Sequence, residues 1–94
     1  MAGRVPKRLK RSCDTPAKAL GAVITGLRLA KGWSYHKVAA DVDCDSSYMN
    51  AIEHGRQNPT FSLLKAIADV HKTKLSLIFA RAERLHVNCP KKKA

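Results

Sequence analysis

Aromatic residues are scarce in this sequence, although hydrophobic residues are not. Phe, Trp and Tyr make up 5% of the 94 residues, whereas 45% of the residues are hydrophobic. A core must therefore consist mainly of aliphatic side chains, which favours small packed helices over a β-sandwich. A chain of this length is enough for one small domain with tails and a modest buried core.

Cysteines are also few, and their number is odd. Cys13, Cys44 and Cys89 show no Cys-x-x-Cys spacing, so we expect no disulfide framework, and a reducing compartment fits. Cys44 is expected to be a small buried hydrophobic residue in a turn, with a redox switch as the alternative. Cys13 and Cys89 are expected in the tails.

The sequence lacks the spacing of a metal site or an enzyme. The four histidines, at positions 36, 54, 71 and 86, show no ligand spacing. Asp41, Asp43 and Asp45 resemble the start of a calcium loop, but its glycine and later ligands are missing. No paired carboxylates, activated nucleophile or phosphate-cradling glycine loop is recognisable. We therefore expect no cofactor and no catalytic residue.

Long apolar segments are missing as well. The basic N-terminus is not followed by the apolar stretch of a signal peptide, and no segment approaches the length of a membrane-spanning helix. We therefore expect a cytoplasmic, nucleoid-associated protein with no membrane partner.

Acidic residues are fewer than basic residues: the chain has 7 Asp and Glu but 18 Lys and Arg, which gives a net charge of +11. This balance favours a polyanionic partner, with nucleic acid first and an anionic membrane surface second, while a merely soluble basic domain is the plain alternative. We predict a basic disordered arm over residues 1–14, a folded domain over 15–86 and a basic tail over 87–94. The arm either follows DNA phosphates and the minor groove or only keeps the chain soluble.

Apolar periodicity and capping residues predict five helices. The first begins at Pro16, capped by Asp14 or Thr15, and Gly32 ends it. Two short helices follow, capped by Ser34 and Asp45, and the second of them ends at His54-Gly55. A fourth helix is expected at about Phe61–His71 with Phe61, Leu64, Ile67 and Ala68 facing inward, and a fifth at about Leu75–Leu85.

The stretch from about Ala19 to Ala82 resembles the helix-turn-helix domain of lambda-repressor-like (Xre-type) bacterial and phage regulators. The joint spacing that carries the resemblance includes Leu20-Gly21, Leu27-Arg28, Lys31-Gly32-Trp33-Ser34, Val38-Ala39, Tyr48-Met49, Ile52-Glu53-His54-Gly55, Asn58-Pro59-Thr60, Leu64, Ile67-Ala68 and Leu75-Ser76-Leu77-Ile78-Phe79. It implies an all-α, compact five-helix domain that binds double-stranded DNA.

The resemblance also implies residue roles. Base reading falls to Ser46, Ser47, Asn50 and Ala51. Phosphate contacts fall to Tyr35, Lys37, Arg56, Gln57, Asn58 and Thr60. Arg28 and Glu53 are expected to form a structural ion pair. The last helix is expected to form the homodimer contact through exposed Leu77, Ile78 or Leu85.

Four positions depart from the family pattern or from good helix electrostatics. Tyr35 replaces the usual glutamine, but its hydroxyl can still donate to a phosphate. Lys37 places a cation near a helix N-terminus, which is locally unfavourable unless a phosphate lies nearby. Asp43 replaces the usual turn glycine, and it tolerates the left-handed conformation better than most residues. His71 stands where leucine is usual, and we expect it to be partly buried and neutral.

We therefore predict a sequence-specific transcriptional regulator, a repressor or autoregulator, that binds a palindromic operator as a homodimer. One alternative is an interaction module, such as an antitoxin or coactivator, that needs a protein partner. The other is a sequence-blind nucleoid or RNA binder, which would fit the charge and the undistinguished Ser, Asn and Ala surface.

Overall fold

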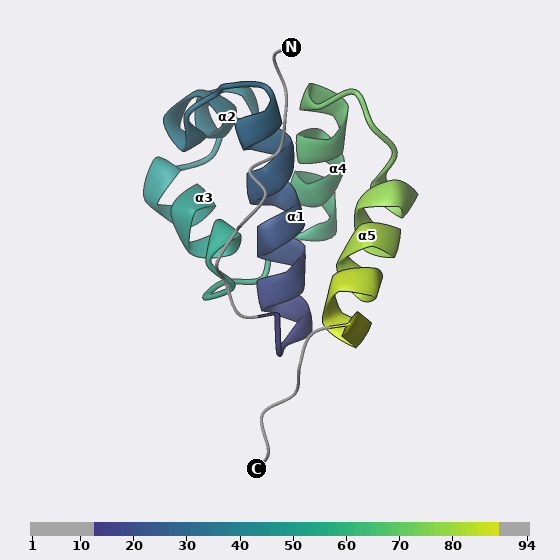
Figure 1. Ribbon diagram of the computed structural model, residues 1–94. Coiled ribbons are helices and arrows are strands. Elements are labelled where there is room, and N and C mark those ends of the chain that lie inside the picture. Colours follow the sequence, from purple (N-terminus) through teal and green to yellow (C-terminus); the bar gives the residue numbers. More distant parts are fainter. Residues whose placement is uncertain (1–12, 89–94) are drawn as a thin grey trace.

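The computed structural model describes residues 13–88, and in that range it contains five helices and no strand. They are α1 (Pro16–Ala30), α2 (Tyr35–Asp41), α3 (Ser46–Glu53), α4 (Phe61–Val70) and α5 (Leu75–Asn88). α1 runs through the middle, with α2 and α3 on one side and α4 and α5 on the other (Figure 1). The predicted all-α, five-helix architecture is confirmed.

Four helices begin directly after a capping side chain. Each of these side chains accepts a hydrogen bond of 3.1 Å from a backbone N–H in the first helical turn. The capping residues are Thr15, Ser34, Asp45 and Thr60. Because each cap satisfies an otherwise free N–H group, the starts of α1 to α4 are determined locally.

Left-handed backbone conformations follow the first four helices. Gly32 and Gly55 have φ values of 72° and 74°, and Asp43 reaches 60°, as predicted for the turn between α2 and α3. Lys72, which was not singled out, adopts a φ of 55° between α4 and α5. The turn that connects α2 to α3 therefore forms without glycine.

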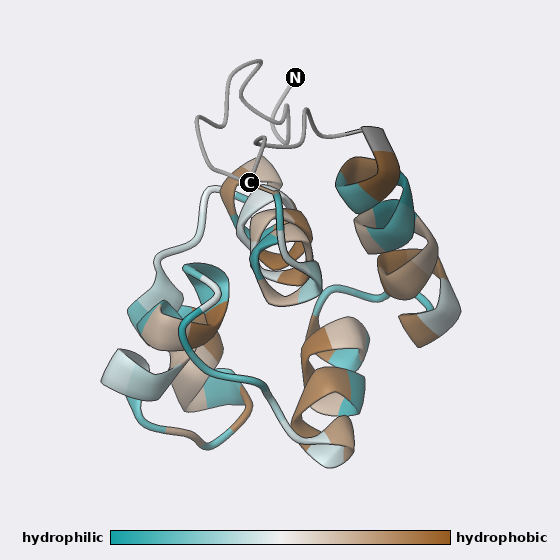
Figure 2. Ribbon diagram, turned by 90° about the horizontal axis from the view of Figure 1, so that it is seen from below, coloured by the Kyte–Doolittle hydropathy of each residue, from teal (hydrophilic) through white to brown (hydrophobic). Residues whose placement is uncertain are grey.

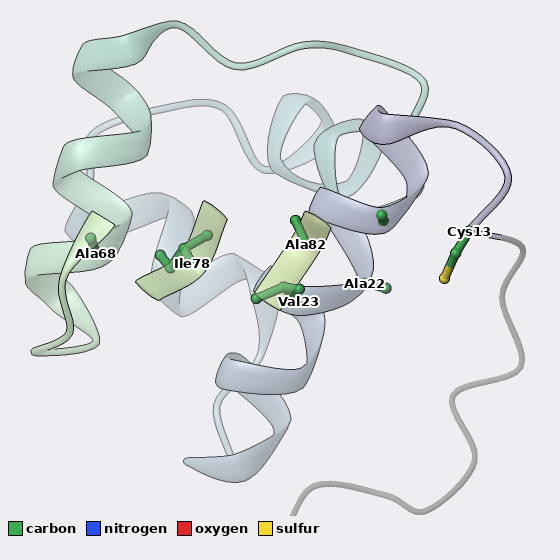
Figure 3. Packing of buried hydrophobic residues seen from close by; sticks show 7 residues of the cluster. Cys13, Ala22, Val23, Ala68, Ile78 and Ala82 are labelled. Carbon is green, nitrogen blue, oxygen red and sulfur yellow. The ribbon is translucent and has the colours of Figure 1, made fainter. Parts of the chain in front are cut away.

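The core consists of two clusters that both use α1. The α1–α5 cluster contains Cys13, Ala19, Ala22, Val23, Ala68, Ile78 and Ala82 (Figure 3). The α2–α4 cluster contains Ile24, Val38, Ala39, Met49, Ile52, Leu64 and Ile67. Both are aliphatic apart from the Cys13 thiol and the Met49 thioether, as the composition requires.

Gly21 permits an unusually close contact between α1 and α3. A Cβ atom at Gly21 would overlap the Glu53 carbonyl oxygen and would lie 2.6 Å from the Ile52 carbonyl oxygen. Both neighbours are backbone atoms, so neither can move aside as a flexible side chain would. The absence of a side chain at Gly21 thus sets how closely α3 approaches the rest of the domain.

Two predicted orientations on the last two helices are wrong. Phe61 is 70% exposed rather than inward, because helical side chains lean towards the N-terminus and the first residue of α4 extends beyond its own helix. Ile78 is only 1% exposed, because it faces α1 within the α1–α5 cluster. Ile78 therefore cannot form a contact with a second copy of the chain.

The ends of the domain also differ from the prediction. Cys13, expected in the arm, is buried, and His86 Nδ1 donates to its carbonyl oxygen at 2.9 Å. α5 continues past Leu85 to Asn88. The predicted arm and tail otherwise lie outside the described residues, as does Cys89.

Candidate nucleic-acid interface

α3 has an inner and an outer face, as its periodicity predicts. Met49, Ile52 and Glu53 are buried. The four expected base-reading residues lie on the other side, where Ser47 is exposed and Ser46, Asn50 and Ala51 are partly exposed. The structure thus brings all four to one surface of short side chains, as direct access to base edges in a major groove requires.

The N-terminal end of this surface carries a fixed negative charge. The Ser47 backbone N–H donates to Asp45 Oδ2 at 3.1 Å, and the Ser47 hydroxyl donates to the same oxygen. These hydrogen bonds from Ser47 hold the pKa of Asp45 below its usual value. The Ser47 hydroxyl proton is therefore engaged, and this side chain presents mainly an acceptor to the outside.

The start of α2 contributes Tyr35 and Lys37. The Tyr35 side chain is half-buried and stacks on the His36 ring with a centroid distance of 4.5 Å. Lys37 Nζ lies 2.6 Å from Asp41 Oδ2 and 4.5 Å from the centre of the Trp33 ring. Lys37 therefore has an internal partner, so its expected phosphate contact requires a shift away from Asp41.

The connection between α3 and α4 is exposed and hydrophilic (Figure 2). Arg56, Gln57 and Asn58 all lie on the surface there. Tyr48 donates its hydroxyl to the Asn58 carbonyl oxygen at 3.2 Å, which ties the connection to α3. The Thr60 hydroxyl accepts from Leu63 N, so its oxygen is used first as a helix cap.

Arg28 and Glu53 form the expected ion pair beneath this surface. Arg28 Nε donates to Glu53 Oε2 at 2.7 Å, and Nη2 donates to Oε1 at 2.9 Å. Arg28 Nη1 also donates to the Trp33 carbonyl oxygen at 2.8 Å. The Glu53 side chain is only 1% exposed, so its charge depends on this two-point contact. One guanidinium thus joins α1, the turn before α2, and α3.

His54 is a residue of this surface that sequence reasoning treated only as a helix end. It is exposed, and His54 Nδ1 donates to the Asn50 carbonyl oxygen at 2.9 Å. The signal was available, because positions 47, 50, 51 and 54 recur at the three- and four-residue spacing of one helix face.

Neither a metal-holding cluster nor a membrane-spanning helix is found among residues 13–88. No group of three or more His, Cys, Asp or Glu side chains there is arranged to hold a metal ion. No helix of that range combines the length and the apolar character needed to cross a membrane.

A capped turn between two short helices, with a polar outer face on the second and a basic connection after it, defines the helix-turn-helix class of DNA-binding transcription regulators. Residues 19–78 match the family model described as a helix-turn-helix domain. Since this match covers more than half of the chain, the protein belongs to the helix-turn-helix family, and its predicted resemblance and regulatory class are confirmed.

Similar proteins agree with this assignment. The transcriptional regulator ClgR of Mycobacterium tuberculosis is 31% identical in an alignment of 75 residues that covers 72% of this chain and 67% of ClgR. The fold is shared with the clp gene regulator ClgR from Corynebacterium glutamicum, at a TM-score of 0.75, 20% identity and 78% coverage of both chains. It is also shared with the restriction-modification controller protein C.AhdI from Aeromonas hydrophila, at a TM-score of 0.64, 24% identity, and 66% and 94% coverage.

Proposed function

We propose that this protein binds a palindromic operator as a homodimer and represses or autoregulates transcription there, with α3 as the recognition helix. The observation that carries the proposal is the construction of α3. Its inner face is anchored by the Arg28–Glu53 pair, and its outer face carries short polar side chains next to exposed Arg56. Such a helix is free to enter a major groove while its orientation stays fixed.

Asn50 is the main base-reading residue in this proposal. A carboxamide can contact adenine N6 and N7 together, whereas a serine hydroxyl discriminates weakly and Ala51 can only touch a thymine methyl group. Because α3 offers no outward arginine or glutamine, much of the specificity must come from DNA shape and bridging water.

The phosphate contacts surround α3 on two sides. Arg56, Gln57 and Asn58 are exposed after its C-terminus, and the hydrogen bond from Tyr48 fixes the position of Asn58 relative to α3. Tyr35 and Lys37 flank the capped N-terminus of α2, where free backbone N–H groups favour an anion. A phosphate there would attract Lys37 away from Asp41.

We place the dimer contact on α5 and leave Ile78 out of it, because Ile78 is buried. Leu77, Phe79 and Leu85 are 43%, 39% and 39% exposed, and these are high values for large apolar side chains. Two half-sites read by such a dimer would lie about one helical turn, or roughly 34 Å, apart.

A partner-dependent module is the second candidate, and one observation favours it. A groove of about 600 Å³ between α1 and α5 is lined mainly by apolar residues, among them Pro16, Leu20, Phe79 and Ala82. A helix of a toxin or coactivator could occupy this groove, which is also where a second copy of the chain could bind. In that case the isolated protein would bind DNA weakly and without a consensus.

Enrichment of bound fragments from a random DNA pool at near-physiological salt tests the proposal. We expect a palindromic consensus that blurs or disappears with Asn50→Ala. Asp69→Ala is the control, because Asp69 is exposed on α4 and pairs with Lys65, away from α3. An unchanged consensus in the Asn50 variant would refute base reading by this residue. No consensus, together with binding that is lost steeply as salt rises, would favour the sequence-blind binder.

A further inference from the structure

His71 is a buried polar side chain whose place in the fold the DNA contacts do not explain. It caps the C-terminus of α4 and is 5% exposed. Neither of its ring nitrogens has a hydrogen-bond partner among the described residues. Its ring instead stacks on Trp33, with a centroid distance of 5.4 Å and an interplanar angle of 30°. Burying a polar group in this way is costly, so a neutral imidazole here acts mainly as a flat packing surface.

Trp33 connects His71 to the start of α2. It directly precedes the Ser34 cap, and its carbonyl oxygen accepts from Arg28 Nη1 at 2.8 Å. Its ring packs against the α2–α4 cluster. A change in how His71 supports this indole would therefore be felt at the N-terminus of α2, where Tyr35 and Lys37 are placed for phosphate contact.

The contacts continue from Trp33 to the recognition helix. The same Arg28 guanidinium that binds the Trp33 carbonyl oxygen holds both carboxylate oxygens of Glu53 at the end of α3. His71, Trp33, Arg28 and Glu53 thus form a continuous chain of contacts. It joins the end of α4 to the two helices of the DNA-binding motif.

Most of the charged groups around His71 disfavour a positive charge on its ring. Burial lowers the pKa of His71, and Lys31 lowers it further, while Glu53 on α3 raises it and Arg28 on α1 lowers it. From α2, Lys37 lies 4.5 Å from the Trp33 ring, and Lys31 lies 5.5 Å from that ring. An imidazolium would gain from the indole ring, but two ammonium groups already lie over the same ring.

We propose that His71 is a positioning residue for the DNA-binding face, and that its protonation in mildly acidic solution loosens Trp33 and α2 and so weakens DNA binding. Only the last step, the weakening of DNA binding, rests on the proposed function. A proton on His71 must be solvated or paired, which requires the ring to leave its stack and removes the support of Trp33. The position of α2 and α3 then becomes less well defined.

The free protein offers a direct readout, because Trp33 is the only tryptophan in the chain. We would follow its fluorescence, and the protection of amide hydrogens in the first turn of α2 relative to their intrinsic exchange rate at the same pH, between about pH 5 and pH 8, where histidines titrate. Both should change together in the full-length wild-type chain. With His71→Leu, which keeps an apolar support and cannot bind a proton, both should vary less with pH than in the wild type. His86→Gln is the matched control and should behave as the wild type, since His86 bonds to Cys13 at the α1–α5 cluster.

DNA affinity supplies the second readout, measured on a duplex enriched from the random pool. We expect the wild type to lose about fivefold more affinity than His71→Leu between neutral and mildly acidic pH, which is the low end of couplings between distinct sites. Comparing the two proteins removes the contributions of the exposed histidines, because both proteins retain them.

Several outcomes would overturn the inference. Wild-type fluorescence and α2 amide protection that do not vary with pH would do so, and so would a His71→Leu variant that keeps the full wild-type pH dependence. Should His71→Leu fail to fold, the His71→Gln variant and the wild-type titration still test the role of His71. A pool that yields no enriched duplex counts against the proposed function instead, while the fluorescence and exchange data continue to test the role of His71.

Discussion

Gly21 allows the position of α3 to be tested by the addition of one methyl group. In Gly21→Ala the new Cβ would overlap the Glu53 carbonyl oxygen and lie 2.7 Å from the Glu53 carbonyl carbon. Ordinary contacts of this kind begin near 3.4 Å. The end of α3 must therefore move away from α1, and the Arg28–Glu53 pair opposes this movement because it holds the same residue.

The expected cost follows from two opposing terms. Overpacking of a tight contact costs about 1–3 kcal/mol, and replacing glycine by alanine within a helix returns up to about 1 kcal/mol. We therefore expect Gly21→Ala to lower the free energy of unfolding by about 1–2 kcal/mol, in which the overpacking term dominates. For a domain of this size the midpoint of thermal unfolding should fall by roughly 5–10 °C.

The displacement should also reach the DNA. If the shift of α3 removes one bidentate contact between Asn50 and adenine, specific affinity should fall about tenfold, since such a contact contributes roughly 1–3 kcal/mol. Urea unfolding and fluorescence anisotropy with the enriched duplex measure the two effects. Ile78→Val is the control: it should cost about 0.5–1.5 kcal/mol of stability but leave affinity unchanged, because Ile78 packs against α1 away from α3. A Gly21→Ala protein with wild-type stability and affinity would refute the reasoning.

Four further predictions concern charge, pH and assembly. Glu53→Ala should cost about 3–5 kcal/mol in urea unfolding, because it leaves the Arg28 guanidinium without its buried partner. The lowered pKa of His71 means that the unfolded chain binds the proton more readily. The stability that neutral His71 contributes is therefore fully present above the ordinary histidine pKa, and it is lost as pH falls from there through the lowered pKa of the folded state. Thermal unfolding at a series of pH values should show that this loss is smaller in His71→Leu. Arg56→Ala should weaken binding similarly across sequences and reduce the slope of log affinity against log salt by about 1. Leu85→Lys should shift sedimentation towards the monomer, and an unchanged dimer would exclude this face.

The helix starts were predictable from sequence because they depend on neighbouring residues. Ser34 and Asp45 accept from N–H groups only two or three residues ahead, so a short stretch contains all the information. The outer face of α3 was predictable for a similar reason, since helical periodicity fixes which side chains share a side.

The orientations that were predicted wrongly or missed depended on how distant helices are arranged. Leu77 and Ile78 are adjacent apolar residues, and only the position of α1 decides that Ile78 is the buried one. Phe61 has the spacing of an inward residue, but no earlier turn of α4 exists to hold its ring. The stack of His71 on Trp33 joins residues far apart in the chain, and no local pattern indicates it.

The dual role of α1 has a consequence for how the domain unfolds. α1 supplies Ala19, Ala22 and Val23 to one cluster and Ile24 to the other, and its buried Thr25 hydroxyl donates to the Gly21 carbonyl oxygen at 2.8 Å. Neither half can therefore open without exposing the side chains of the other. Such an arrangement favours a single cooperative transition, in which the central amides of α1 exchange with solvent only when the whole molecule unfolds.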